Sequence, residues 1–227
     1  MNLPIPIEQI QAGIRRNTLV IESERPLRTL SSAVLNGGFR DAAVIVNHQV
    51  PKSYEHADLE AYLRDVVEAL GFRSEKAVGL MTAADVQDVA IVTKTSRNLI
   101  VCALVTAGLS YPATAGDAIA IEGKQSGTIN IILLVDGNLS ESCMVDAAGT
   151  ATEAKTVALR ELEVKSHYSG EIASGTTTDA LVIACTGRGD VLKYAGTATE
   201  LGQLIGRSVR EAVKEAIRKG KVPNLNQ

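Results

Sequence analysis

Two stretches of the chain repeat their hydrophobic residues at the spacing of an amphipathic helix. They predict helices over Asp58–Leu70 and from about Glu200 to Lys219. Asp58 suits the N-cap of the first helix, and Gly71 suits a left-handed stop. A third helix is predicted from about Ala151 to Glu163, where Thr150 and Glu153 have capping-box spacing.

Short runs of β-branched and aliphatic residues between these helices predict strands. They are Thr18–Glu22, Ala42–Val46, Val89–Thr93, Leu99–Val105, Thr128–Val135 and Ala180–Cys185. Several are almost continuously apolar, which is typical of strands covered on both faces. Strands and helices do not alternate regularly, so we predict an α+β fold: a single layered domain over residues 1–227, with a largely buried mixed β-sheet covered by helices. Residues 1–17 form an N-terminal segment, residues 221–227 are expected to be a flexible tail, and the strand order stays open.

Composition and charge narrow the class of protein. The 227 residues are 45% hydrophobic but only 3% aromatic, without Trp, so the core is built from aliphatic side chains. A formal net charge of −3 gives no basic field for nucleic acid or anionic lipid, and no apolar stretch approaches the roughly 20 residues of a membrane span. Cys102, Cys143 and Cys185 form no CxxC pair, which favours buried free thiols. We therefore expect a cytoplasmic protein that binds neither nucleic acid nor membrane.

Three loops rich in Gly, Ser and Thr lie beside the predicted strands, at residues 28–38, 106–117 and 174–179. Small residues let a ligand approach the backbone closely, and exposed amide groups can bind an anion or an oxyanion. One such loop is an ordinary turn signal, but three in one small domain predict a ligand cleft.

Five blocks of sequence occur in an order that resembles a known family. They are RTLSSAVLNGG (28–38), VTAGLSYPATAGD (105–117), GTINIILLVD (127–136), ATEAKTVAL (151–159) and SGTTTDALVIA (174–184). Together they resemble the adenosylcobinamide amidohydrolase family of corrinoid salvage, and residues 194–206 are similar to its closing helix region. The resemblance extends from about Thr18 to the last predicted helix.

The resemblance implies a specific reaction. The amide that joins a propionyl side chain of the corrin ring to 1-amino-2-propanol is hydrolysed, which gives adenosylcobyric acid and the free amine. The expected partner is thus a small-molecule corrinoid, whose cobalt belongs to the substrate. No further cofactor is predicted, and the metal requirement, a homo-oligomer and strictness for the adenosyl group stay open.

A protein-bound metal has weak support in the sequence. His48, His56 and His167 form no HExxH motif or other close ligand pair. His48 ends an apolar run and could face a cleft, although a strand-end histidine is the more common case, and His56 suits an exposed loop. Asp136, Glu153 and Asp179 could hold a metal, but their spacing does not specifically support one, so we predict no metal site.

Hydroxyl and carboxylate side chains provide the catalytic candidates. Amide hydrolysis needs an attacking oxygen, a base, donors for the oxyanion and an acid for the leaving amine. Thr177 and Asp179 place hydroxyl and carboxylate groups in one loop, and Glu153 and Lys155 are expected near a helix N-terminus. We predict these four as catalytic. The alternatives are turn hydroxyls, a capping carboxylate and a solvent-facing lysine.

The same loops supply the predicted substrate-binding residues: Arg28, Ser31, Ser32, Asn36, Gly175 and Thr176. Arg28 and Asn36 suit the peripheral amides or carboxylates of a corrin, or they brace their loop. Two other functions stay open: a hydrolase of another small amide, and a non-catalytic corrinoid-binding protein. The turn at Gly187–Asp190 lacks the spacing of a phosphate-binding loop.

Overall fold

The computed structural model describes residues 2–52, 54, 57–119 and 127–221. His56 and residues 222–227 of the predicted tail lie outside these ranges. The helices are α1 (Leu59–Ala69), α2 (Glu141–Glu161) and α3 (Glu200–Lys221), with short 3-10 turns η1 (Ser74–Lys76) and η2 (Val86–Asp88). The main sheet contains β1 (Asn2–Leu3), β2 (Ile10–Arg15), β3 (Thr18–Ser31), β4 (Gly38–Gln49), β5 (Ala77–Thr82), β6 (Ala90–Ser96), β7 (Leu99–Ala107), β9 (Ile129–Asp136) and β12 (Ala180–Cys185). Two separate pairs join β8 (Pro112–Ala113) to β11 (Gly175–Thr176) and β10 (Asn138–Leu139) to β13 (Val191–Leu192).

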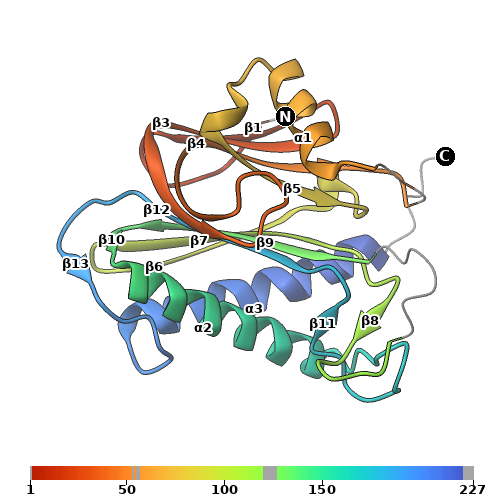
Figure 1. The fold of residues 1–227 in the computed structure, drawn as a ribbon. Helices are drawn as coiled ribbons and strands as arrows, with labels where there is room; N and C mark the ends of the chain where they lie inside the picture. The colour runs from red at the N-terminus through yellow and green to blue at the C-terminus, as the bar shows by residue number, and fades with distance from the viewer. Residues whose placement is uncertain (1, 53, 55–56, 120–126, 222–227) are drawn as a thin grey trace.

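The long strand β3 folds the main sheet into two stacked layers. The strand order is β1-β2-β3-β12-β9-β7-β6, and β4 with β5 branches from β3. The first half of β3 pairs with β2 and β4, its last residues pair with β12, and its register with β4 shifts between Glu22 and Leu27. One layer thus contains β2, β3, β4 and β5, and the other contains β12, β9, β7 and β6 (Figure 1). Within the main sheet, the β12–β9 and β4–β5 pairs are parallel and the other pairs are antiparallel, so the predicted mixed sheet is confirmed.

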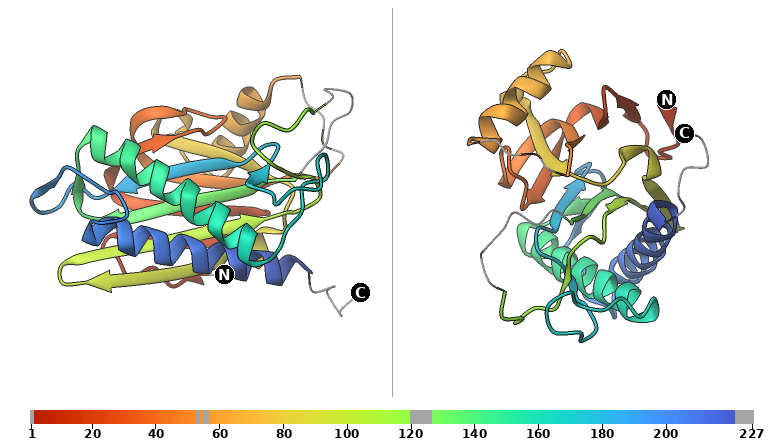
Figure 2. Two further views of the ribbon diagram at one scale, coloured as in Figure 1. Left: turned by 90° about the horizontal axis from the view of Figure 1, so that it is seen from below. Right: turned by 90° about the vertical axis from the view of Figure 1, so that its right-hand side faces the viewer.

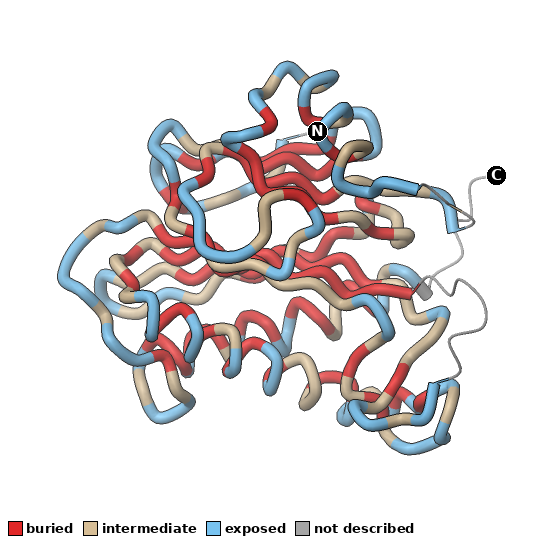
Figure 3. Tube along the Cα trace, viewed as in Figure 1, coloured by how far each residue is buried: buried red, intermediate tan, exposed pale blue. Residues whose placement is uncertain are grey.

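Helices cover both outer faces of this double layer. The helices α2 and α3 lie side by side beneath β12, β9, β7 and β6, whereas α1 packs on the opposite side (Figures 1 and 2). Three buried clusters fill the spaces: one between α2, α3 and the sheet, one between the two sheet layers, and one under α1 (Figure 3). This is the predicted α+β class with a buried sheet. No helix in the described ranges is long and apolar enough to cross a bilayer.

The start of α2 differs from the prediction. The helix begins at Glu141, where the Ser140 hydroxyl accepts a hydrogen bond from the Cys143 N–H at 3.2 Å, and not near Ala151. Thr150 lies inside the helix and donates to the Ala195 carbonyl at 2.8 Å, so the capping box predicted for Thr150 and Glu153 is wrong. The buried face is built largely from alanines, whose weak hydrophobic signal conceals the first turns of the helix.

The prediction of a loop that starts at Arg28 is also partly wrong, because β3 continues to Ser31. A polar stretch with Pro26 interrupts the apolar pattern after Glu22, at the place where the register shifts. The N-terminal segment 1–17, for which no strand is predicted, contributes β1 and β2. By contrast, Asp58 caps α1 as predicted, accepting from the Ala61 N–H at 2.9 Å, and Gly71 follows with φ of 90°.

Candidate active site

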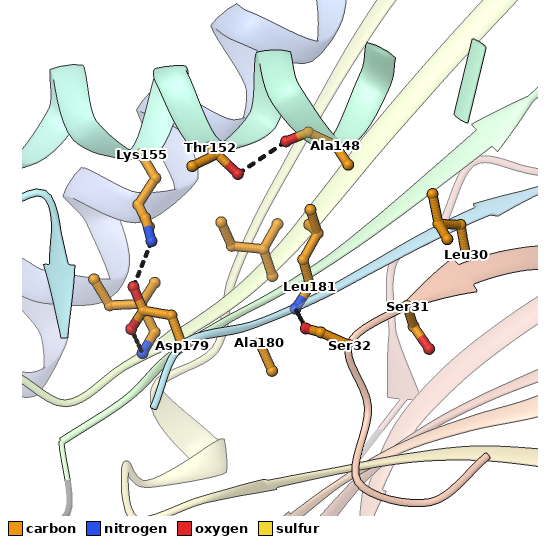
Figure 4. Close-up of a pocket in the computed structure, with 11 residues that line it drawn as sticks. Leu30, Ser31, Ser32, Ala148, Thr152, Lys155, Asp179, Ala180 and Leu181 are labelled. Atoms are coloured by element: carbon orange, nitrogen blue, oxygen red, sulfur yellow. Dashed lines mark hydrogen bonds and ion pairs between the residues drawn. The ribbon is translucent and has the colours of Figure 1, made fainter. Parts of the chain in front are cut away.

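The segment between β11 and β12 brings a carboxylate into contact with a lysine from α2. Asp179 lies immediately before β12, and the Lys155 ammonium reaches its Oδ2 at 2.5 Å (Figure 4). The two side chains are only 14% and 12% exposed, respectively. Because Lys155 lies well inside α2 and Asp179 borders a central strand, the sheet and the helix fix both ends of this ion pair.

Asp179 is held by four donors from the described residues. Lys155 Nζ and the Thr176 N–H, at 3.1 Å, reach Oδ2, while the Ile129 N–H at 2.9 Å and the Thr176 hydroxyl at 2.5 Å reach Oδ1. The single proton of the Thr176 hydroxyl faces two acceptors, Asp179 Oδ1 and the Gly127 carbonyl at 2.7 Å, and Asp179 Oδ1 is the nearer of the two. A carboxylate has about four acceptor positions, and four donors face them here. Asp179 is therefore better suited to positioning Lys155 than to taking a proton.

Lys155 keeps donor capacity that Asp179 does not use. An ammonium has three N–H donors, and within the described residues its one recorded acceptor is Asp179. Lys155 and Asp179 together line a cavity of about 380 Å³, whose other walls come from Leu30, Ser31, Ser32, Ile129, Ile131, Ala148, Thr152, Ala180 and Leu181. A largely buried ammonium thus faces a mostly aliphatic cavity with donors available for a ligand.

Gly175 is required by this ion pair. A Cβ at position 175 would overlap Asp179 Oδ2 and would lie 2.8 Å from Lys155 Nζ. Gly175 therefore lets the backbone of β11 approach the charged pair closely, which is a different use from the ligand contact that the sequence predicts.

Ser31 and Ser32 reach the same cavity from the end of β3. The Ser32 hydroxyl oxygen accepts from the Leu181 N–H at 3.1 Å, as Figure 4 shows, and no acceptor for its own proton is recorded in the described part of the chain. The Ser31 hydroxyl is buried without a hydrogen-bond partner there. The structure thus brings together Lys155, Asp179, Ser31 and Ser32 around one cavity, while Thr176 binds Asp179 and Gly175 lies against the ion pair.

Four other predicted site residues lie apart from the cavity. Glu153 and Thr177 are exposed and are not among the residues that line it. Arg28 donates to the Leu139 carbonyl at 3.1 Å. Asn36 has φ of 57° and donates to the Ser74 and Ala77 carbonyls at 2.8 and 2.7 Å. Arg28 and Asn36 therefore brace the fold, which is the alternative that their loop position allowed.

A second cavity, of about 540 Å³, meets the first at Ser32, Asp179 and Ala180. Two buried asparagines that the sequence analysis missed, each 1% exposed, are linked to its wall through Met81. Asn130 donates to the Met81 carbonyl at 2.7 Å and to the side chain of Asn47 at 2.9 Å. An asparagine inside an otherwise apolar strand was the available signal, since buried amides require partners.

The metal candidates do not gather into a site. Within the described ranges, no group of three His, Cys, Asp or Glu side chains is placed to hold a metal ion. Asp136 pairs with Arg188 at 3.2 Å. His48 lies between the hydroxyls of Thr18, at 2.8 Å, and Tyr62, at 3.0 Å, and burial lowers its pKa. His48 thus has structural partners on both ring nitrogens.

Comparisons with known proteins show which family this chain resembles. A protein of Methanocaldococcus jannaschii, named as uncharacterized, is 31% identical over 224 residues, which cover 88% of this chain and 85% of that protein. The adenosylcobinamide amidohydrolase of Methanosarcina mazei is 31% identical over 217 residues, covering 92% and 98%. Among solved structures, a protein from Pyrococcus horikoshii aligns with 92% of this chain and 79% of its own length, at 12% identity and a TM-score of 0.49.

The family model described as adenosylcobinamide amidohydrolase matches residues 4–223 of this chain. This match includes β12, α2 and the loop that joins Lys155 to Asp179, and it agrees with the resemblance noted in the sequence. The chain belongs to the adenosylcobinamide amidohydrolase family.

Proposed function

We propose that this protein hydrolyses the amide between the propionyl side chain of the corrin ring and 1-amino-2-propanol in adenosylcobinamide. Water adds to the amide carbonyl, the C–N bond breaks, and adenosylcobyric acid and 1-amino-2-propanol leave. One water molecule is consumed, and its two hydrogens are shared between the carboxyl and amine products. The family and the name of the Methanosarcina relative support this substrate.

The observation that carries the proposal is the Lys155 ammonium, fixed against Asp179 at 2.5 Å with its other donors available to the cavity. Hydrolysis of an amide builds negative charge on the carbonyl oxygen, and a preoriented cation in a water-poor site stabilises that charge strongly. An ammonium can also give a proton to the departing amine. Lys155 is therefore assigned as the catalytic residue that stabilises the oxyanion.

Asp179 and Ser32 complete this assignment. Asp179 is a positioning residue, because its acceptor positions are occupied by Lys155, Thr176 and Ile129. Ser32 has an unassigned hydroxyl proton and lies on the rim that both cavities share, so it is suited to donate to the scissile carbonyl. Lys155 and Ser32 would then hold the carbonyl oxygen between them.

Replacement of Lys155 tests the proposal directly. Lys155→Met keeps the length and apolar stem of the side chain but removes the charge, while Asp179 keeps its donors from Thr176 and Ile129. Lys193→Met, at an exposed lysine outside the cavity, is the matched control. Mass spectrometry of protein incubated with adenosylcobinamide follows the appearance of adenosylcobyric acid.

We expect about a 100-fold or larger loss of turnover in Lys155→Met, comparable to the loss of an oxyanion donor, and none in Lys193→Met. Equal turnover in both variants would exclude Lys155 from the chemistry. Intact substrate after incubation with folded wild-type protein, with and without EDTA, would instead favour the corrinoid-binding alternative. Faster cleavage of simple amides than of adenosylcobinamide would favour a hydrolase with another substrate.

A further inference from the structure

The second cavity is larger than the first, and its walls are similarly apolar. Its apolar lining includes Val34, Val50, Leu59, Leu80 and Met81, and its volume of about 540 Å³ exceeds the 380 Å³ of the cavity that contains Lys155. Both cavities contact Ser32, Asp179 and Ala180, so one extended molecule could occupy both by crossing this shared rim.

Two exposed aliphatic side chains line the larger cavity. Val34 follows β3 and Leu59 begins α1, and each is 41% exposed. Two separate elements therefore present apolar surface to the same space. Aliphatic residues that remain exposed at a cavity wall mark a binding surface, because a ligand can remove them from water.

We infer that the second cavity holds the corrin end of the substrate, while the aminopropanol end enters the first cavity beside Lys155. The inference rests on the proposed function and adds the orientation of the substrate. The corrin is the bulky end, a macrocycle with apolar faces and a fringe of amides, so it requires the larger cavity. Aminopropanol is short and polar, and it matches the smaller cavity, where Lys155 supplies donors. The scissile amide then crosses the rim at Ser32 and Asp179.

Charged substitutions in the second cavity test this orientation. Leu59→Glu places an acidic residue in the first turn of α1, where it is favourable for the helix, so a folding defect is not expected. Val34→Glu introduces the same negative charge from the segment that follows β3. Val145→Glu is the matched control, because Val145 is 56% exposed on α2 and lines neither cavity.

Equilibrium dialysis with adenosylcobyric acid, followed by the visible absorbance of the corrin, measures binding without turnover. This probe lacks aminopropanol and reports on the corrin end alone. We expect Leu59→Glu and Val34→Glu to bind it about tenfold more weakly, because a carboxylate must be desolvated, and Val145→Glu to bind it as the wild type does. With adenosylcobinamide, the KM of the two cavity variants should rise while kcat changes little.

The outcomes separate this inference from the proposed function. If the wild type hydrolyses adenosylcobinamide but Leu59→Glu and Val34→Glu bind adenosylcobyric acid normally, the orientation is wrong and the activity stands. Free adenosine could instead compete with adenosylcobyric acid for the wild type but not for these two variants. That result would assign the cavity to the adenosyl group and would also overturn the inference. If the wild type neither binds nor cleaves a corrinoid, the proposed function itself fails.

Discussion

Gly175→Ala is the smallest change that should disturb the candidate active site. The new methyl group would overlap Asp179 Oδ2 and lie 2.8 Å from Lys155 Nζ. Asp179 cannot move aside freely, because Thr176 and Ile129 hold both of its oxygens. The φ of Gly175 is not among the positive values, so alanine brings no backbone strain, and the effect comes from the ion pair alone.

The magnitude follows from the bonds on Oδ2, which come from Lys155 at 2.5 Å and from the Thr176 N–H at 3.1 Å. A hydrogen bond to a charged group contributes about 1.5–3 kcal/mol. Alanine also restricts the unfolded chain more than glycine does. This effect stabilises the folded state by about 0.4–1 kcal/mol and offsets part of the loss. Loss of one bond therefore lowers the free energy of unfolding by about 0.5–2.6 kcal/mol, or the Tm by about 1–10 °C for a chain of this size.

The assay compares Gly175→Ala with Gly149→Ala in thermal unfolding and in turnover. Gly149 lies on the exposed side of α2, and a methyl group there would meet no atom within 4 Å, so alanine should stabilise the helix by about 1 kcal/mol. The same substitution should thus change Tm in opposite directions at the two sites. Turnover should fall about 100-fold in Gly175→Ala alone, because Lys155 is displaced. A Gly175→Ala protein with wild-type Tm and turnover would refute the requirement for a fixed ion pair.

Three further predictions follow from the placement of other side chains. Glu153→Ala should leave turnover within about twofold, because Glu153 is exposed away from the cavity; a loss comparable to that of Lys155→Met would restore its catalytic assignment. The three buried thiols should resist alkylation at pH 8 until denaturant is added, above all Cys143, where burial raises the pKa to about 11; mass spectrometry counts the labels. Burial lowers the pKa of His48 from 6.5, so the unfolded chain binds its proton first and stability falls as the pH drops below about 6.5; chemical denaturation at several pH values should show a smaller fall in His48→Gln.

The sequence predicts the elements whose hydrophobic patterns are strong. The six predicted strands all lie in or overlap strands of the sheet, because their aliphatic runs are buried on both faces. The strand β5 escapes prediction, since Ala77 and Gly79 dilute its pattern. The early turns of α2 escape for a related reason: Ala147 and Ala151 pack closely against neighbouring elements but contribute little to a hydrophobic stripe. Strand order could not be predicted, because the shift within β3 that sends it into both layers depends on tertiary pairing.

For the candidate site, the sequence pointed to the segment of residues 174–179 but could not give the contacts that this segment makes. The loop of residues 174–179 was expected to supply a nucleophile and a base, yet its most conspicuous exposed hydroxyl, Thr177, does not line the cavity. Lys155 was expected near a helix N-terminus. It lies instead in the second half of a longer helix, where it contacts Asp179, 24 residues away in sequence. Such a contact has no local signature, so the sequence alone could not rank Lys155 above Glu153.

The ion pair of Lys155 and Asp179 is difficult to explain as a device for stability. Removing two charges from water costs several kcal/mol, and well-packed apolar residues would often serve a core as well or better. A structural pair would also be expected to use the hydrogen-bonding capacity of both partners, whereas four donors face Asp179 and Lys155 has one recorded acceptor among the described residues. Lys155 therefore retains unused N–H donors, and Lys155 lines the cavity. Gly175 preserves the same arrangement by leaving room where any side chain would collide with it. The carboxylate fixes the position of the ammonium, and the ammonium keeps N–H donors for a ligand. The ammonium is therefore a preoriented positive charge, which the hydrolysis of an amide requires at the carbonyl oxygen.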